Sequence, residues 1–99
     1  MSFRVRISTA AQGDLERLLD HLAPLDYDAA LRARAAIERG YEFLTEMPFA
    51  CRKVDDANPF LRELLIAFGD SGYVALFEIV DSTNVAILAV RHQREDDYL

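Results

Sequence analysis

Three apolar runs in the second half of the chain decide the fold: FLRELLIAF at 60–68, YVALFEIV at 73–80 and VAILAV at 85–90. The tetrapeptides GDSG at 69–72 and DSTN at 81–84 separate them, and tight turns favour Gly, Asp, Asn and Ser. Short apolar runs bounded by turn residues are typical of strands. The sequence therefore predicts a three-stranded antiparallel meander that is well covered on one face and partly covered on the other.

The start of the chain predicts a strand followed by a helix. Phe3, Val5 and Ile7 alternate with polar residues, which is the period of a strand with one buried face. Residues 9–12 (TAAQ) fit a capping box for a helix that Pro24 closes. Asp14, Glu16, Arg17 and Asp20 are expected on its polar face. Its apolar stripe is predicted to consist of Ala11, Leu15, Leu18, Leu19 and Leu22.

A second helix is expected to start near Asp26 or Asp28, either of which could cap it, and to end at Pro48. Small residues dominate its first half and permit close helix packing, so the two helices should form an antiparallel hairpin. Residues 48–59 read as a loop. The apolar stripe of this helix is predicted to be Ala30, Ala33, Ile37, Tyr41 and Leu44.

These elements predict a two-layer α+β fold for a single domain at 1–99: an N-terminal strand, a two-helix hairpin and a three-stranded meander in one sheet. The longest apolar runs are far shorter than the roughly 20 residues that span a bilayer. No signal sequence opens the chain, so we expect a cytoplasmic protein without a membrane partner.

Charge and composition exclude several classes of function. With 11 basic and 17 acidic residues the net charge is −6, which argues against a general nucleic-acid binder. Cys51 is the only cysteine, so no internal disulfide or cysteine-rich zinc site can form. Arg52 and Lys53 could lower the pKa of its thiol, but no base partner is evident. The two histidines lie 71 positions apart, and His21 is expected at a helix edge, so neither a metal nor another cofactor is predicted.

Candidate functional residues follow the last apolar run. Arg91, His92 and Arg94 come directly after it, and a strand end holds such groups in place for recognition or catalysis. The alternative is a solvated terminus in which the two arginines pair with Glu95, Asp96 and Asp97.

The ending ILAVRHQRE at 87–95 resembles the RelE/ParE toxin family, the toxins of bacterial type II toxin–antitoxin modules. The order of the predicted elements matches the usual layout of this family, which has an Arg early in the meander. That residue is Arg62 here, in NPFLREL at 58–64. The resemblance extends from Val5 to Tyr98 and implies a RelE/ParE-like toxin domain.

The resemblance implies one of two activities. The RelE-like branch cleaves messenger RNA on the ribosome, and here Arg62 and Arg91 would hold the phosphate while His92 or Tyr98 transfers a proton. The supply of such groups is thin, because Lys53 is the only lysine and the net charge opposes docking on ribosomal RNA. Acidic residues 95–97 would also repel a phosphate.

The ParE-like branch poisons DNA gyrase and has no known nuclease chemistry. It requires only a shaped contact surface, for which the candidates are Arg62, Arg91, His92 and Arg94. The His-x-Arg spacing at 92–94 resembles a pattern near the end of ParE-like sequences. We therefore favour a gyrase inhibitor of the plasmid-stabilisation type that arrests growth. The remaining alternative is a non-toxic protein-binding module of the same fold.

The resemblance also implies a cognate antitoxin, ParD-like or similar. The chain has more apolar side chains than one helical hairpin can readily cover, which is typical of a partner site. A helix laid in a groove or a strand added to a sheet edge could cover them, and a homodimer is the alternative. The aromatic members of this set are Phe49, Phe60, Phe68, Tyr73 and Phe77.

Overall fold

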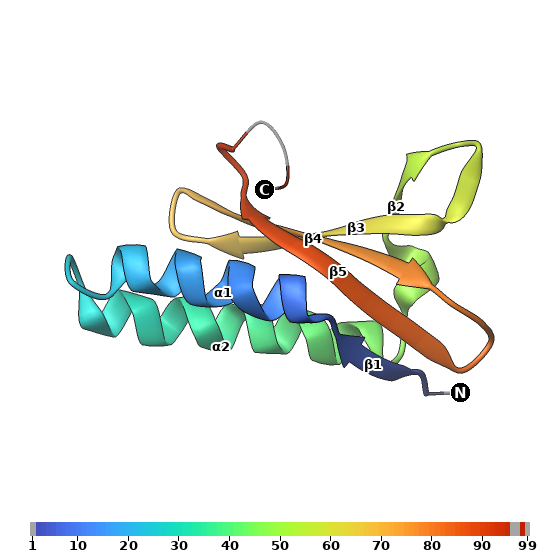
Figure 1. Ribbon diagram of the computed structural model, residues 1–99, viewed down its shortest axis with the longest axis horizontal. Coiled ribbons are helices and arrows are strands. Elements are labelled where there is room, and N and C mark those ends of the chain that lie inside the picture. The colour runs from blue at the N-terminus through green and yellow to red at the C-terminus, as the bar shows by residue number, and fades with distance from the viewer. Residues whose placement is uncertain (1, 96–97, 99) are drawn as a thin grey trace.

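The computed structural model describes residues 2–95 and 98 and places two helices against one face of a five-stranded sheet (Figure 1). The strand order is β1-β5-β4-β3-β2, in which β1 is parallel to β5 and the other neighbours are antiparallel. This arrangement confirms the predicted α+β class. The elements are β1 (Arg4–Ile7), α1 (Thr9–Leu22), α2 (Tyr27–Leu44), the 3-10 helix η1 (Pro48–Ala50), β2 (Arg52–Asp55), β3 (Asn58–Phe68), β4 (Ser71–Ile79) and β5 (Asn84–His92).

The predicted capping box of α1 is wrong by one residue. Ser8 is the N-cap, and its Oγ accepts a hydrogen bond from the backbone N–H of Ala11 at 3.0 Å. The same residue closes the junction with the sheet, because its N–H donates to the carbonyl of Ile87 and its hydroxyl to that of Leu88. The contacts of this residue with the sheet decide where β1 ends and α1 starts. The local sequence pattern gives no sign of those contacts.

The second helix agrees more closely with its prediction. Asp26 is the N-cap, and its carboxylate accepts from the N–H of Ala29 at 3.0 Å. Its predicted apolar stripe is buried throughout. The helix ends at Leu44, and Pro48 begins η1 instead of closing α2. Within the described residues, no helix is long and apolar enough to cross a membrane.

The loop predicted at 48–59 is wrong, because this segment contains η1, β2 and the start of β3. β2 pairs antiparallel with β3, and Arg52 lies opposite Glu63 with its guanidinium 2.8 Å from the carboxylate. All four β2 residues are exposed, so the strand buries no apolar face. Its sequence, RKVD, also lacks the alternation of apolar and polar residues that marks a strand. Pairing with β3 forms it, and the sequence of β2 carries no sign of that pairing.

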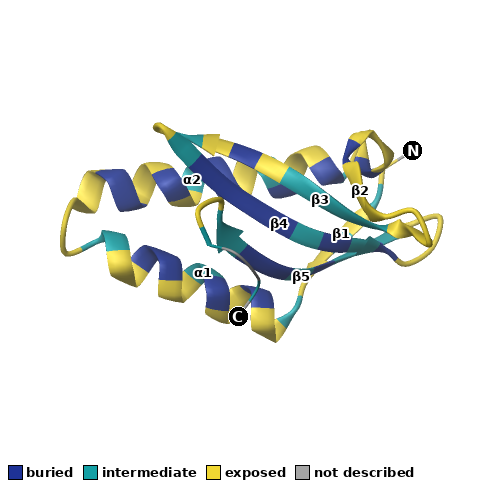
Figure 2. Ribbon diagram, turned by 90° about the horizontal axis from the view of Figure 1, so that it is seen from above, coloured by how far each residue is buried: buried dark blue, intermediate teal, exposed yellow. Residues whose placement is uncertain are grey.

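The core lies between the helices and the sheet, and Ile37, Leu44, Phe77 and Ile87 are fully buried there. Figure 2 views the opposite face of the sheet, which we call the outer face because neither helix covers it. Directly paired residues of neighbouring antiparallel strands point to the same face. This rule assigns the side chains of β3 and β5 to one face or the other.

Candidate functional site

Arg62 lies on the helix side of the sheet, since it pairs with the buried Phe77. Its Nε donates to the carbonyl of Pro59 at 2.8 Å, and its Nη1 donates to the carbonyls of Phe49 and Cys51 at 3.0 and 2.8 Å. The guanidinium also lies 5.4 Å from the ring centre of Phe49. Arg62 therefore joins the segment after α2 to the start of β3.

Arg91 lies on the outer face, opposite Val74 of β4. Its Nη1 donates to the carbonyl of Glu95 at 2.7 Å and to that of His92 at 3.2 Å, so the guanidinium holds the turn that follows β5. The same guanidinium lies 5.2 Å from the ring centre of Tyr98. Arg91 and Tyr98 are thus brought together, although seven positions separate them in the chain.

Tyr98 connects Arg91 to a carboxylate on β3. Its hydroxyl donates to Oε2 of Glu63 at 2.5 Å, while Oε1 of Glu63 accepts from Arg52. Burial, the hydrogen bond with Glu63 and the charge of Glu63 raise the pKa of Tyr98 well above its ordinary range, against the lowering effect of Arg91. Tyr98 therefore keeps its proton at neutral pH. We call Arg52, Glu63, Arg91 and Tyr98 the outer-face cluster.

His92 points to the helix side, where it pairs with Tyr73 and its ring meets the Tyr73 ring edge-on at 5.6 Å. Its Nδ1 accepts from the backbone N–H of Arg94 at 3.1 Å, so Nε2 carries the proton and donates to the hydroxyl of Ser71 at 3.1 Å. Both ring nitrogens of this histidine are consequently engaged within the fold.

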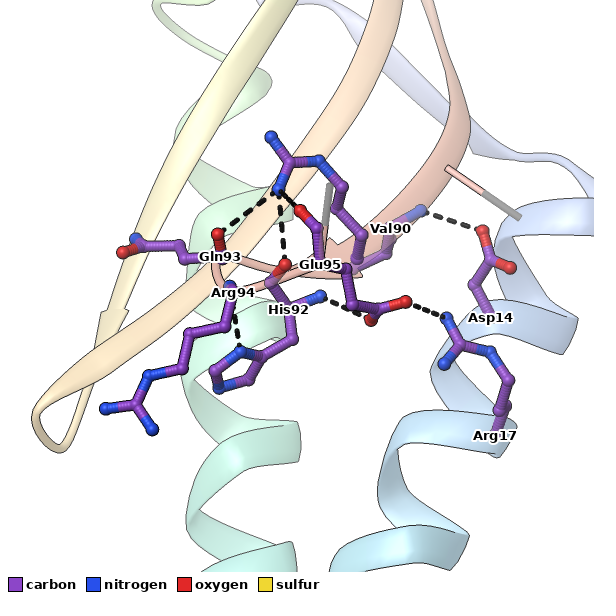
Figure 3. A network of polar contacts seen from close by, with 8 residues as sticks. Asp14, Arg17, Val90, His92, Gln93, Arg94 and Glu95 are labelled. Atoms are coloured by element: carbon purple, nitrogen blue, oxygen red, sulfur yellow. Dashed lines mark hydrogen bonds and ion pairs between the residues drawn. The ribbon is translucent and has the colours of Figure 1, made fainter. Parts of the chain in front are cut away.

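The turn after β5 is fastened to α1 through Glu95 (Figure 3). One oxygen of this carboxylate accepts from the backbone N–H of His92 at 2.9 Å, and the other lies 3.5 Å from Nη2 of Arg17. Arg94 is exposed, and Figure 3 shows its side chain extending away from the network. Asp96 and Asp97, which the sequence offered as partners of Arg91 and Arg94, lie outside the described residues.

A pocket of about 630 Å³ opens between α1 and this turn, and His21, His92, Arg17 and Arg94 contribute to its wall. The exposed His21 lies on α1 at the edge of this pocket, so the fold brings the two histidines to one place. In the described part of the chain, no three His, Cys, Asp or Glu side chains are grouped to hold a metal ion.

Two residues differ from their sequence-based interpretation. Asp14, expected on the polar face of α1, is 9% exposed and accepts from the buried N–H of Val90 at 2.9 Å. Its spacing from Ala11 and Leu18 is that of the apolar stripe and was a usable signal. Burial raises the pKa of Cys51, and the charge of Arg62 only partly opposes it. The lowering of this pKa that Arg52 and Lys53 could have caused is therefore not found.

Comparisons with known proteins identify the family of this chain. The family model of the ParE toxin of the type II toxin–antitoxin system parDE matches residues 5–97. Toxin RelE1 of Caulobacter vibrioides (strain ATCC 19089 / CIP 103742 / CB 15) is 36% identical over 83 residues, which are 84% of this chain and 86% of that protein. A chain in the solved structure "Chromosomal ParDE TA system from P. aeruginosa" has a TM-score of 0.70 at 20% identity, covering 92% of this chain and 96% of that one. The last likeness concerns the fold.

Proposed function

This chain belongs to the ParE toxin family of type II toxin–antitoxin systems, and from that premise we propose that it inhibits DNA gyrase until an antitoxin neutralises it. The proposal places the protein in the cytoplasm, where gyrase acts on DNA. It also predicts growth arrest when the chain is produced without its antitoxin.

The observation that carries the choice of gyrase is the separation of the groups that a ribonuclease would need at one phosphate. A cleavage site requires cations and proton-transfer groups around the same reacting atoms. Here Arg62 and His92 lie on the helix side of the sheet, whereas Arg91 and Tyr98 lie on the outer face. The Arg62 guanidinium and both ring nitrogens of His92 are also occupied by bonds within the fold.

The outer-face cluster supports the same choice. Tyr98 contacts both Arg91 and the carboxylate of Glu63, and the charge of that carboxylate would repel an incoming phosphate. The proton of Tyr98 is held by that carboxylate, so its phenol is a poor general base at neutral pH. Apolar residues lie beside this cluster on the outer face. Leu76 is paired with Glu63, and Leu65 is paired with Val74. Apolar side chains beside this cluster suit contact with a protein.

We propose that the contact with gyrase is made at the end of β5, through Arg94 and the turn that Arg91 and His92 hold in place. Arg94 is the exposed member of this group, and its side chain leaves the network. Arg62 stays a predicted contact from the sequence, but its bonds to three carbonyls favour a role in the fold.

The test uses the purified chain in two assays, supercoiling by gyrase and cleavage of a translated message in a cell-free ribosome system. We expect loss of supercoiling and an intact message. Arg94→Glu should relieve the inhibition, whereas Arg34→Glu, which changes the same charge at an exposed position of α2, should not. Message cleavage with unaffected gyrase would establish the RelE-type alternative. Inactivity in both assays, without growth arrest in cells, would leave the non-toxic binding module.

A further inference from the structure

A hollow of about 440 Å³ lies at the end of the molecule that carries β1, η1 and the turn between β4 and β5 (Figure 1). Small-molecule sites in proteins have volumes of about 300–1,000 Å³, so this hollow is large enough to hold one. Its wall combines aromatic rings, aliphatic side chains and one carboxylate, which come from Phe3, Phe49, Phe60, Ile79, Val80 and Asp81.

The hollow exists because the sheet extends past the end of α2. Phe60 faces the helix side, since it lies two positions from Arg62 on the same strand. The helix ends at Leu44, and the N–H of Phe3 donates to the carbonyl of Thr45, the residue that follows, at 2.6 Å. Among the described residues, none of α2 contributes to the wall of the hollow. The aromatic side chains at this end of the sheet are therefore left partly uncovered.

Three phenylalanine rings stand at steep angles to one another in this wall. The ring centres of Phe3 and Phe60 each lie 6.4 Å from that of Phe49, with interplanar angles of 64° and 76°. Phe49 and Phe60 are 53% and 50% exposed. The face of an aromatic ring carries negative potential and attracts a cation that lies within about 6 Å of the ring centre. Rings arranged in this way can present such faces to one ligand from several directions.

The central ring is already held by a cation of the fold. The guanidinium of Arg62 lies 5.4 Å from the ring centre of Phe49 and is fixed by its bond to the carbonyl of the same residue at 3.0 Å. Arg62 is not among the residues that line the hollow, so its charge lies outside it. The contact therefore orients the ring before a ligand enters, and such preorganisation favours binding.

Asp81 supplies a negative charge with few free acceptor positions. Its Oδ1 accepts from the N–H of Thr83 at 2.9 Å and from the side-chain amide of Asn84 at 3.0 Å. These hydrogen bonds hold the pKa of Asp81 below its ordinary value, so the carboxylate is ionised at neutral pH. A primary ammonium has three N–H donors to satisfy, whereas a fully alkylated ammonium has none. The site therefore suits a cation that carries methyl groups in place of N–H groups.

We infer that this hollow binds a quaternary ammonium group, with its methyl groups against the rings of Phe3, Phe49 and Phe60 and its charge opposite Asp81. A free quaternary amine and the side chain of a trimethylated lysine present this same chemistry. The inference goes beyond the inhibition of gyrase, because the hollow lies at the start of β5, whereas Arg94 follows the end of that strand.

The experiment is an NMR titration of the purified chain with choline and with 3,3-dimethylbutan-1-ol, which has the same shape without the charge. We expect choline to bind roughly fivefold more tightly or better, because only the cation interacts with the ring faces and with Asp81. Its methyl protons should move upfield, since they lie over aromatic rings. A peptide that contains trimethyl-lysine distinguishes the two sources: whichever of choline and the peptide binds more tightly identifies the natural form, and either order upholds the inference.

Two variants and one control place the site. Phe60→Leu keeps an apolar side chain and removes one ring, and Asp81→Asn removes the charge while keeping an acceptor for Thr83. Each should weaken choline binding roughly fivefold or more, and Asp81→Asn should leave binding of the alcohol unchanged. Phe43→Leu is the matched control and should have no effect, since Phe43 is 42% exposed on α2 and does not line the hollow.

The outcomes decide the inference without involving gyrase. Equal affinities for choline and the alcohol would show a merely apolar hollow and overturn it. Binding of neither compound to the wild-type chain would overturn it equally, as would unchanged choline binding in both folded variants. If Phe60→Leu does not fold, Asp81→Asn and the comparison of the two compounds still decide. The supercoiling assay remains a separate test of the target.

Discussion

Replacement of Arg62 by Met tests whether this arginine serves the fold or the target. Methionine keeps the apolar stem and removes the three hydrogen bonds to the carbonyls of Pro59, Phe49 and Cys51. It also removes the contact of the guanidinium with the ring of Phe49. The segment from η1 to the start of β2 would then lose these side-chain connections to β3.

The cost follows from the exposure of these groups. The bond to the carbonyl of buried Cys51 is worth about 1.5 kcal/mol, because water does not easily replace it. The two more exposed bonds and the ring contact contribute about 0.5 kcal/mol each. The sum is about 3 kcal/mol of unfolding free energy, or a fall in Tm of roughly 12–24 °C for a chain of this length.

Urea unfolding followed by circular dichroism measures the loss, with Arg34→Met on the exposed face of α2 as a control that should stay within about 0.5 kcal/mol. Gyrase inhibition is then measured at a temperature where both variants are folded, and we expect both to inhibit. An Arg62→Met chain of wild-type stability that no longer inhibits gyrase would refute this reasoning and make Arg62 a contact residue.

Three further predictions concern the buried polar groups. Asp14→Ala leaves the N–H of Val90 unsatisfied and should lower the unfolding free energy by about 2–3 kcal/mol in urea, whereas the exposed Asp20→Ala should change it little; equal stabilities would contradict the role of Asp14. Burial and the charge of Asp14 raise the pKa of Tyr41 to about 12, from about 10 in the unfolded chain. Its contribution is therefore complete below pH 10 and is lost, by about 2–3 kcal/mol, as the pH rises to 12. Tyr41→Phe should flatten that part of the stability profile, and an unchanged slope would disprove the assignment. Burial also raises the pKa of Cys51, so an alkylating reagent should label the native thiol at least tenfold more slowly than the thiol in urea; similar rates would show an accessible thiolate.

Local patterns in the sequence determined the elements that rest on local physics. The apolar spacing of α2 was sufficient to place that helix and left two candidates for its cap, Asp26 and Asp28, of which the structure uses Asp26. The turn residues at 69–72 and 81–84 were sufficient to separate the three long strands, and Gly69 has the positive φ of 59° that favours glycine. The ending at 87–95 and the order of the predicted elements together indicated the family, which the family model over residues 5–97 confirms.

Tertiary structure alone decided which side chains meet. Arg62 and Arg91 look alike in the sequence, yet strand pairing sends one to the helices and the other to the outer face beside Tyr98. Pairing also creates β2 from four exposed residues, and its register with β3 reaches from Asn58 to Glu63 among the residues that the structure describes. The physical reason is that a strand's face and neighbour depend on the register with distant residues, and no local period of hydropathy contains that register.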